Sequence, residues 1–97
     1  MKAVMIMYNQ ILEREVEEIL NRLSLRGFTR WQDVQGRGTE EGEPHMGTHT
    51  WPVLNGTILT VVGAEAVPML LEALRSLDRS APGRGVRAFV WAIEESV

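Results

Sequence analysis

Four stretches of the chain carry the apolar patterns of β-strands. Residues 3–8 are apolar without interruption, and residues 57–62 are apolar and β-branched, as in strands that are covered on both faces. Residues 28–35 alternate imperfectly between apolar and polar side chains, and residues 86–93 are almost entirely apolar. We therefore predict four strands, of which the first and the third are buried on both faces.

Two further stretches repeat their apolar side chains at the spacing of an amphipathic helix. In the first stretch, the apolar positions are Leu12, Val16, Ile19, Leu20 and Leu23. Asn9 precedes this helix as a capping residue, and Gly27 is expected to end it. The second helix begins near Glu65, with Pro68 in its first turn, where the missing N–H of proline costs little. Its apolar positions are Val67, Leu70, Leu71, Leu74 and Leu77.

The predicted order is strand, helix, strand, strand, helix, strand, which is typical of the ferredoxin-like βαββαβ fold. We expect residues 1–97 to form one α+β domain, in which both helices cover one face of a four-stranded antiparallel sheet. The opposite face would be largely apolar, because three of the strands carry apolar side chains toward both sides. Monomers in solution rarely expose an apolar patch larger than roughly 300–600 Å². We therefore expect copies of the chain to associate over this face.

The composition of the chain excludes several functional classes. The net charge of −3 argues against a nucleic-acid-binding protein, because phosphate binding needs a basic surface. The chain contains no cysteine, so disulfides and thiolate metal sites are excluded. No apolar stretch has the length of a membrane span, and the apolar run at the start is too short for a signal peptide. We expect a cytoplasmic protein without membrane insertion.

A long loop at residues 38–54 interrupts the apolar rhythm between the second and third predicted strands. It contains three glycines and both histidines of the chain. Compact domains rarely keep so long a connection unless it is functional. We expect this loop to carry the specific interactions of the protein, while the strands and helices present it.

Two short motifs give the chain a resemblance to the PII-like signalling family. The segment Asp33-Val34-Gln35-Gly36-Arg37-Gly38 is similar to the strand end and the first residues of the family's T-loop. The segment Pro82-Gly83-Arg84-Gly85-Val86-Arg87-Ala88-Phe89-Val90 is similar to the glycine-rich B-loop and the strand that follows it. The element order agrees over nearly the whole chain. The resemblance implies a homotrimer in which these two loops bind an adenine nucleotide between subunits.

The same resemblance implies a non-enzymatic signal-transduction protein. Its long loop would change its order when the effector binds, and an unidentified target protein would recognise the change. Glycines can aim backbone N–H groups at an anion, and arginines add charge-assisted hydrogen bonds. The nucleotide-binding residues would be Gly36, Arg37, Gly38, Gly83, Arg84, Gly85 and Arg87. The alternative is ordinary turn chemistry, with glycines in turns and arginines in solvent.

Two features depart from the pattern of the PII-like family. The loop at residues 38–54 contains neither the tyrosine nor the serine that is modified in better-studied branches. The lysine of the B-loop is replaced near Val86, although Arg84 and Arg87 stand close by. The resemblance therefore implies a divergent member that lacks these modification sites.

The loop also contains a pair of histidines, His45 and His49, four residues apart. Imidazoles, together with the glutamates just upstream, suit Zn²⁺ or another divalent metal, and a neighbouring subunit could supply further ligands. This pattern gives an alternative function: a metal-responsive protein that shares the fold and trimer of the CutA-type metal-tolerance proteins. The histidines could instead make only hydrogen bonds. An enzyme with a histidine as base has the least support, because no nucleophile motif is present.

Overall fold

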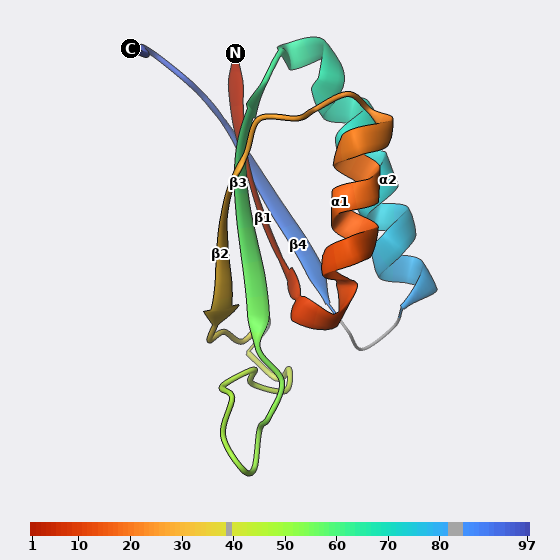
Figure 1. Cartoon of the computed structure of the whole chain (residues 1–97), viewed down its shortest axis with the longest axis vertical. Coiled ribbons are helices and arrows are strands. Elements are labelled where there is room, and N and C mark those ends of the chain that lie inside the picture. The colour runs from red at the N-terminus through yellow and green to blue at the C-terminus, as the bar shows by residue number, and fades with distance from the viewer. Residues whose placement is uncertain (39, 82–84) are drawn as a thin grey trace.

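The strands and helices follow one another in the order that the sequence predicts (Figure 1). The computed structural model describes residues 1–38, 40–81 and 85–97. Its main elements are β1 (Lys2–Asn9), α1 (Glu13–Arg22), β2 (Thr29–Val34), β3 (Asn55–Val62), α2 (Val67–Ser80) and β4 (Val86–Ala92). Short 3-10 turns, η1 (Gln10–Leu12) and η2 (Ala64–Ala66), lead into the two helices. Within these described residues, no helix has the length and apolar character needed to cross a membrane.

The four strands form one antiparallel sheet in the order β2-β3-β1-β4, and both helices lie on the same face of it (Figure 1). β1 lies between two neighbours, with Ile6 paired to Ile58 of β3 and to Ala88 of β4. The two uninterrupted apolar runs of the sequence are therefore the two central strands. This arrangement confirms the predicted ferredoxin-like α+β fold.

The core lies between the sheet and the two helices. Val4, Ile6 and Ile58 point toward the helices and have no exposed surface. They pack against the apolar stripes that the helical spacing predicted. The buried side chains that η1, α1 and α2 contribute are Leu12, Val16, Ile19, Leu20, Leu70 and Leu74.

The first helix ends through a serine, not through the glycine that the sequence suggested. Ser24 adopts the left-handed conformation, with φ of 59°. The N–H of Leu25 donates to the carbonyl of Leu20 at 2.8 Å. The N–H of Ser24 donates to the carbonyl of Asn21 at 3.0 Å, which completes a Schellman motif. The prediction that Gly27 ends the helix is wrong, because these bonds satisfy the last helical carbonyls before the chain reaches it.

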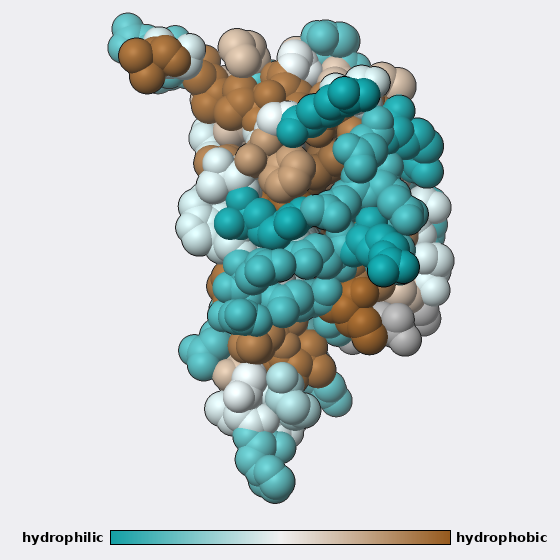
Figure 2. All heavy atoms as spheres, in the orientation of Figure 1, coloured by the Kyte–Doolittle hydropathy of each residue, from teal (hydrophilic) through white to brown (hydrophobic). Residues whose placement is uncertain are grey.

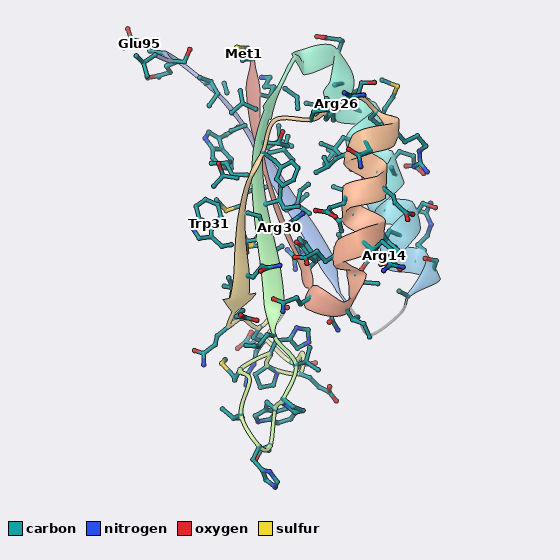
Figure 3. The ribbon with its side chains drawn as sticks, viewed as in Figure 1. Met1, Arg14, Arg26, Arg30, Trp31 and Glu95 are labelled. Carbon is teal, nitrogen blue, oxygen red and sulfur yellow. The ribbon has the colours of Figure 1, made fainter. Side chains whose placement is uncertain are left out.

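The face of the sheet that lies opposite the helices, here called the open face, is apolar and uncovered within the chain. The strand register places on it Ala3, Met5, Met7, Trp31, Thr57, Leu59, Val61, Arg87, Phe89 and Trp91. Trp31 points away from the helices in Figure 3 and is 46% exposed. Phe89 and Trp91 of β4 are 51% and 45% exposed.

The central strands are therefore buried on only one face within a single chain. The two helices lie on the same side and leave Val61 of β3 43% exposed, so the predicted cover of the second face by other copies stays a prediction. The apolar composition predicted for the open face is confirmed. Within a single chain, the large aromatic side chains of this face, Trp31, Phe89 and Trp91, stay exposed to solvent.

The long loop extends away from one end of the sheet (Figure 1). In Figure 2 the far end of this projection is coloured as hydrophilic, in agreement with the exposed residues 47–50. The loop leaves the sheet at the end of β2 and returns at the start of β3. The first residues of β4 lie at the same end of the sheet. Tyr8 of β1 pairs there with Gly56 of β3 on one edge and with Val86 of β4 on the other.

Candidate functional site

A groove of about 920 Å³ lies at the end of the sheet from which the long loop projects. Its lining comes from the ends of β1, β2 and α2, from the long loop, and from the first residues of β3 and β4. Small-molecule sites have volumes of roughly 300–1,000 Å³. The groove is therefore large enough for a nucleotide-sized ligand.

The groove brings together most of the residues that the sequence assigned to a nucleotide site. Gly36, Arg37 and Gly38 line it from the end of β2, and Gly85 and Arg87 line it from the start of β4. The other two predicted residues, at positions 83 and 84, lie outside the described residues. The part that each residue plays in binding stays a prediction, but the two predicted segments do border one groove.

Arg87 links these two segments directly. Its Nη1 atom donates to the carbonyl oxygen of Gly38 at 2.7 Å, although the two residues are 49 positions apart in the sequence. Its guanidinium also lies over the ring of Phe89, with Cζ 5.5 Å from the ring centroid. A guanidinium has five N–H donors in a planar fork. The bond to Gly38 uses one of them, so Arg87 can also bind an anion in the groove.

The base of the loop is a short antiparallel hairpin. Gly36 and His45 exchange both backbone hydrogen bonds, at 2.8 and 2.6 Å, and Gln35 donates its side-chain N–H to the carbonyl of Met46 at 2.8 Å. A Cβ at position 36 would lie 2.7 Å from Nδ2 of Asn55, so a larger residue there would displace the Asn55 side chain. The loop therefore leaves the sheet in a fixed direction that the backbone pairing sets.

A second turn closes the far part of the loop. The N–H of Thr48 donates to the carbonyl of Trp51 at 2.9 Å, and the Thr48 hydroxyl accepts from the N–H of Trp51 at 3.1 Å. Gly47 has φ of 65°, a conformation that favours glycine, and donates to the carbonyl of Val53 at 3.2 Å. Trp51 and Val53 are each 38% exposed. The far part of the loop therefore presents two apolar side chains on a hydrogen-bonded frame.

The two histidines have different surroundings. Nδ1 of His45 lies 2.5 Å from Oδ1 of Asn55 in a partly buried contact at the base of the loop. His49 is exposed in the turn at its far end. Across residues 1–38, 40–81 and 85–97, no three side chains of His, Cys, Asp or Glu come close enough together to hold a metal ion. The metal site at His45 and His49 stays a prediction, and the described chain supplies it with no further ligand.

Tyr8 contributes a neutral wall to the groove. Its hydroxyl donates to Oε1 of Glu13 at 3.2 Å. Burial, followed by the Glu13 carboxylate, raises the pKa of Tyr8 to about 12. The phenol therefore stays protonated at neutral pH. Gly56 pairs with Tyr8 across β1 and β3, and a Cβ at position 56 would come within 2.6 Å of the phenol ring.

The described lining of the groove contains more arginines than carboxylates. Its charged residues are Arg37, Glu43, Asp78, Arg79 and Arg87. One of the carboxylates is already engaged, since Oδ1 of Asp78 accepts from the backbone N–H of Val86 at 2.9 Å. An excess of positive charge, together with backbone N–H groups at glycines, suits an anionic ligand. The sequence motifs did not identify Tyr8 and Asp78, because their neighbours across the groove are far away in the chain.

Comparison with known families supports the resemblance suggested by the two motifs. A family described as nitrogen regulatory protein P-II matches the chain over residues 1–97. No curated protein matches it in sequence. The family match covers both segments that border the groove and the loop between them.

Solved structures with the same fold include CPII from Thiomonas intermedia K12, a nitrogen regulatory PII-like protein bound to ADP, AMP and bicarbonate. It is 20% identical, with a TM-score of 0.75 over 93% of this chain and 82% of that one. The apo form of CPII is 18% identical, with a TM-score of 0.71 over 93% of this chain and 85% of that one. A Thermus thermophilus protein described as PII-like is 24% identical, with a TM-score of 0.64 over 93% of this chain and 82% of that one. At these identities the likeness shows a shared fold.

Proposed function

Because the chain belongs to the nitrogen regulatory protein P-II family, we propose that it is a homotrimeric signal-transduction protein of the cytoplasm that binds an adenine nucleotide. Members of this family are typically non-enzymatic regulators. One observation carries the proposal: five of the seven residues assigned to the nucleotide site line a single groove. The bound ligands of CPII, which are ADP, AMP and bicarbonate, agree with an anionic nucleotide as the effector.

The chemistry of the groove supports this class of ligand. Arg37 and Arg87 can make charge-assisted hydrogen bonds to phosphate oxygens. Gly36, Gly38 and Gly85 allow their backbone N–H groups to approach a phosphate closely. The ring of Phe89 and the side chain of Met7 provide an apolar surface for an adenine base. The ligand would thus lie with its phosphates toward the glycines and its base toward the sheet.

The position of the groove beside the open face supports the proposed trimer. Met7, Thr57, Arg87 and Phe89 belong to both surfaces. A second copy that covers the open face would therefore also add a wall to the groove. The exposed aromatic side chains supply the apolar area that such an association needs.

The loop is the segment proposed to transmit the signal. Its base shares Gly36 and Gly38 with the groove, and Arg87 already holds the Gly38 carbonyl at 2.7 Å. A phosphate bound to Arg87 would compete with this carbonyl or reorient it. The far part of the loop presents Trp51 and Val53, which a target protein could contact.

Isothermal titration with ATP, ADP, AMP and cyclic AMP tests the nucleotide proposal. We expect saturable heat with at least one of them. Arg87→Gln should weaken that binding by about tenfold or more, because it removes a charge-assisted bond. Arg14→Gln is the matched control, since Arg14 is exposed on α1 away from the groove (Figure 3). Absence of heat with all four nucleotides, or equal binding by Arg87→Gln, would contradict the proposal.

A further inference from the structure

The turn that follows β1 contains a half-buried residue, Gln10, whose side chain forms hydrogen bonds with the end of β2. Oε1 of Gln10 accepts from the backbone N–H of Asp33 at 2.6 Å. Nε2 of Gln10 donates to Oδ1 of Asp33 at 2.9 Å. Both ends of the glutamine amide are therefore engaged by a single residue 23 positions away. We call this pair of bonds the Gln10–Asp33 clasp.

Asp33 stands where the pairing of β2 changes register. Trp31 pairs with Thr57, but Val34 pairs with Asn55, so β2 contains one more residue than β3 between these two pairs. Such an extra residue is a β-bulge, and it redirects the strand. Asp33 adopts φ of 58°, a left-handed conformation that is uncommon for residues other than glycine. The clasp bonds to the residue whose conformation makes the bulge.

The bulge decides how the loop leaves the sheet. Gly36 follows Asp33 by three residues and forms the backbone bridge to His45. Without the extra residue, every side chain beyond the bulge would point to the opposite face of the sheet. The positions of Gly36 and Gly38 in the groove therefore depend on the conformation of Asp33.

Backbone groups of Asn9 and Gln10 also form hydrogen bonds with two further segments at the border of the groove. The backbone N–H of Gln10 donates to the carbonyl of Leu54 at 3.0 Å, where the loop returns to β3. The backbone N–H of Asn9 donates to the carbonyl of Gly85 at 3.1 Å, just before β4. Asn9 and Gln10 thus connect the start of the loop, its return and the first residues of β4.

We propose that Gln10 is a positioning residue of the groove, which holds the loop and the binding residues in register through the Gln10–Asp33 clasp. Gln10 itself does not line the groove. It acts through Asp33, which fixes the bulge and so the place of Gly36 and Gly38. The inference rests on the proposed function for its effect on nucleotide binding, but its effect on the loop is independent of any ligand.

A swap of donors and acceptors tests the clasp. Gln10→Glu replaces the donor Nε2 by an oxygen that faces the Asp33 carboxylate, so the two residues repel each other. The double variant Gln10→Glu with Asp33→Asn restores a donor opposite an acceptor. Asn21→Asp is the control, because it also turns an amide into a carboxylate, but at an exposed position of α1 that does not line the groove.

Hydrogen exchange of the chain without ligand is the first measurement. The amides of Gly36 and His45, each bonded to the carbonyl of the other residue, should exchange about tenfold faster in Gln10→Glu. The substitution removes the Nε2–Oδ1 bond, and the repulsion between the two carboxylates opposes the bond that remains. The double variant should return these rates to within about twofold of the parent rates, and Asn21→Asp should leave them unchanged. The dissociation constant of ADP should rise about tenfold in Gln10→Glu and recover in the double variant.

Several results would overturn the inference. Parent-like exchange at Gly36 and His45 in Gln10→Glu would show that the clasp does not hold the loop. Equal acceleration in Asn21→Asp would show a general loss of stability, and failure of the double variant to recover would show that the paired bonds are not the cause. If the parent chain bound none of ATP, ADP, AMP and cyclic AMP, the proposed function would fail, while the exchange rates would still decide whether Gln10 positions the loop.

Discussion

Replacement of Trp91 by glutamine tests whether copies of the chain cover the open face. Trp91 lies on this face at the end away from the groove and does not line it. A tryptophan side chain buries roughly 150–250 Å² when it is fully covered. The 45% of Trp91 that is exposed therefore amounts to roughly 100 Å² that a neighbouring copy could cover. At about 25 cal/mol per Å², this area contributes about 2.5 kcal/mol to the association.

Sedimentation velocity over a dilution series is the assay. At micromolar concentration, we expect the parent protein to sediment as a trimer, with three times the chain mass of 10.9 kDa. Trp91→Gln should dissociate at a concentration between roughly two and three orders of magnitude higher. Each of the three copies loses about 2.5 kcal/mol, the midpoint of a monomer–trimer equilibrium shifts with half of the total, and each 1.4 kcal/mol is a factor of about ten. Met69→Gln is the control, since Met69 is 57% exposed but lies on α2. A parent chain that sediments as a single copy would refute the reasoning, and so would equal shifts in the two variants.

Three further predictions concern residues around the groove. Gly56→Ala would place a Cβ within 2.6 Å of the Tyr8 ring and should lower the free energy of unfolding in urea by about 1–3 kcal/mol; an unchanged midpoint would contradict the packing. Tyr8, the only tyrosine, should titrate near pH 12 in the folded chain and near its ordinary pKa of 10.0 when unfolded. Since folding raises this pKa, its stabilising effect is complete below pH 10 and is lost as the pH rises toward 12; a folded-state midpoint near 10 would disprove the burial. His45→Ala should speed hydrogen exchange at the loop base without metal, whereas His49→Ala should not; zinc-induced stabilisation that both substitutions abolish would favour the metal-responsive alternative.

The order and type of the elements could be predicted because they depend on local spacing. The helical stripe that begins at Leu12 and the apolar run at residues 3–8 both correspond to buried surfaces of the structure. The end of α1 could not be predicted in the same way. Ser24 adopts a left-handed conformation because two backbone bonds to Leu20 and Asn21 hold the turn, and glycine was the expected residue there.

The sequence predicted less of the candidate site than of the fold. The glycines and arginines near positions 36 and 85 were assigned by resemblance, and the structure shows that they border one groove. The clasp between Gln10 and Asp33 joins residues 23 positions apart, so no local pattern predicts it. The hairpin at the base of the loop likewise pairs Gly36 with His45 beyond a bulge that no local pattern predicts.

The most direct test of the account is the affinity of ADP for the chain with and without its neighbours. Equilibrium dialysis would compare the parent with Trp91→Gln, at a protein concentration where the first is trimeric and the second is a single copy. We predict that the single copy binds ADP at least about tenfold more weakly, because the groove loses the wall that a neighbouring copy supplies. Equally tight binding by the single copy, or no binding by either protein, would contradict a nucleotide site between subunits.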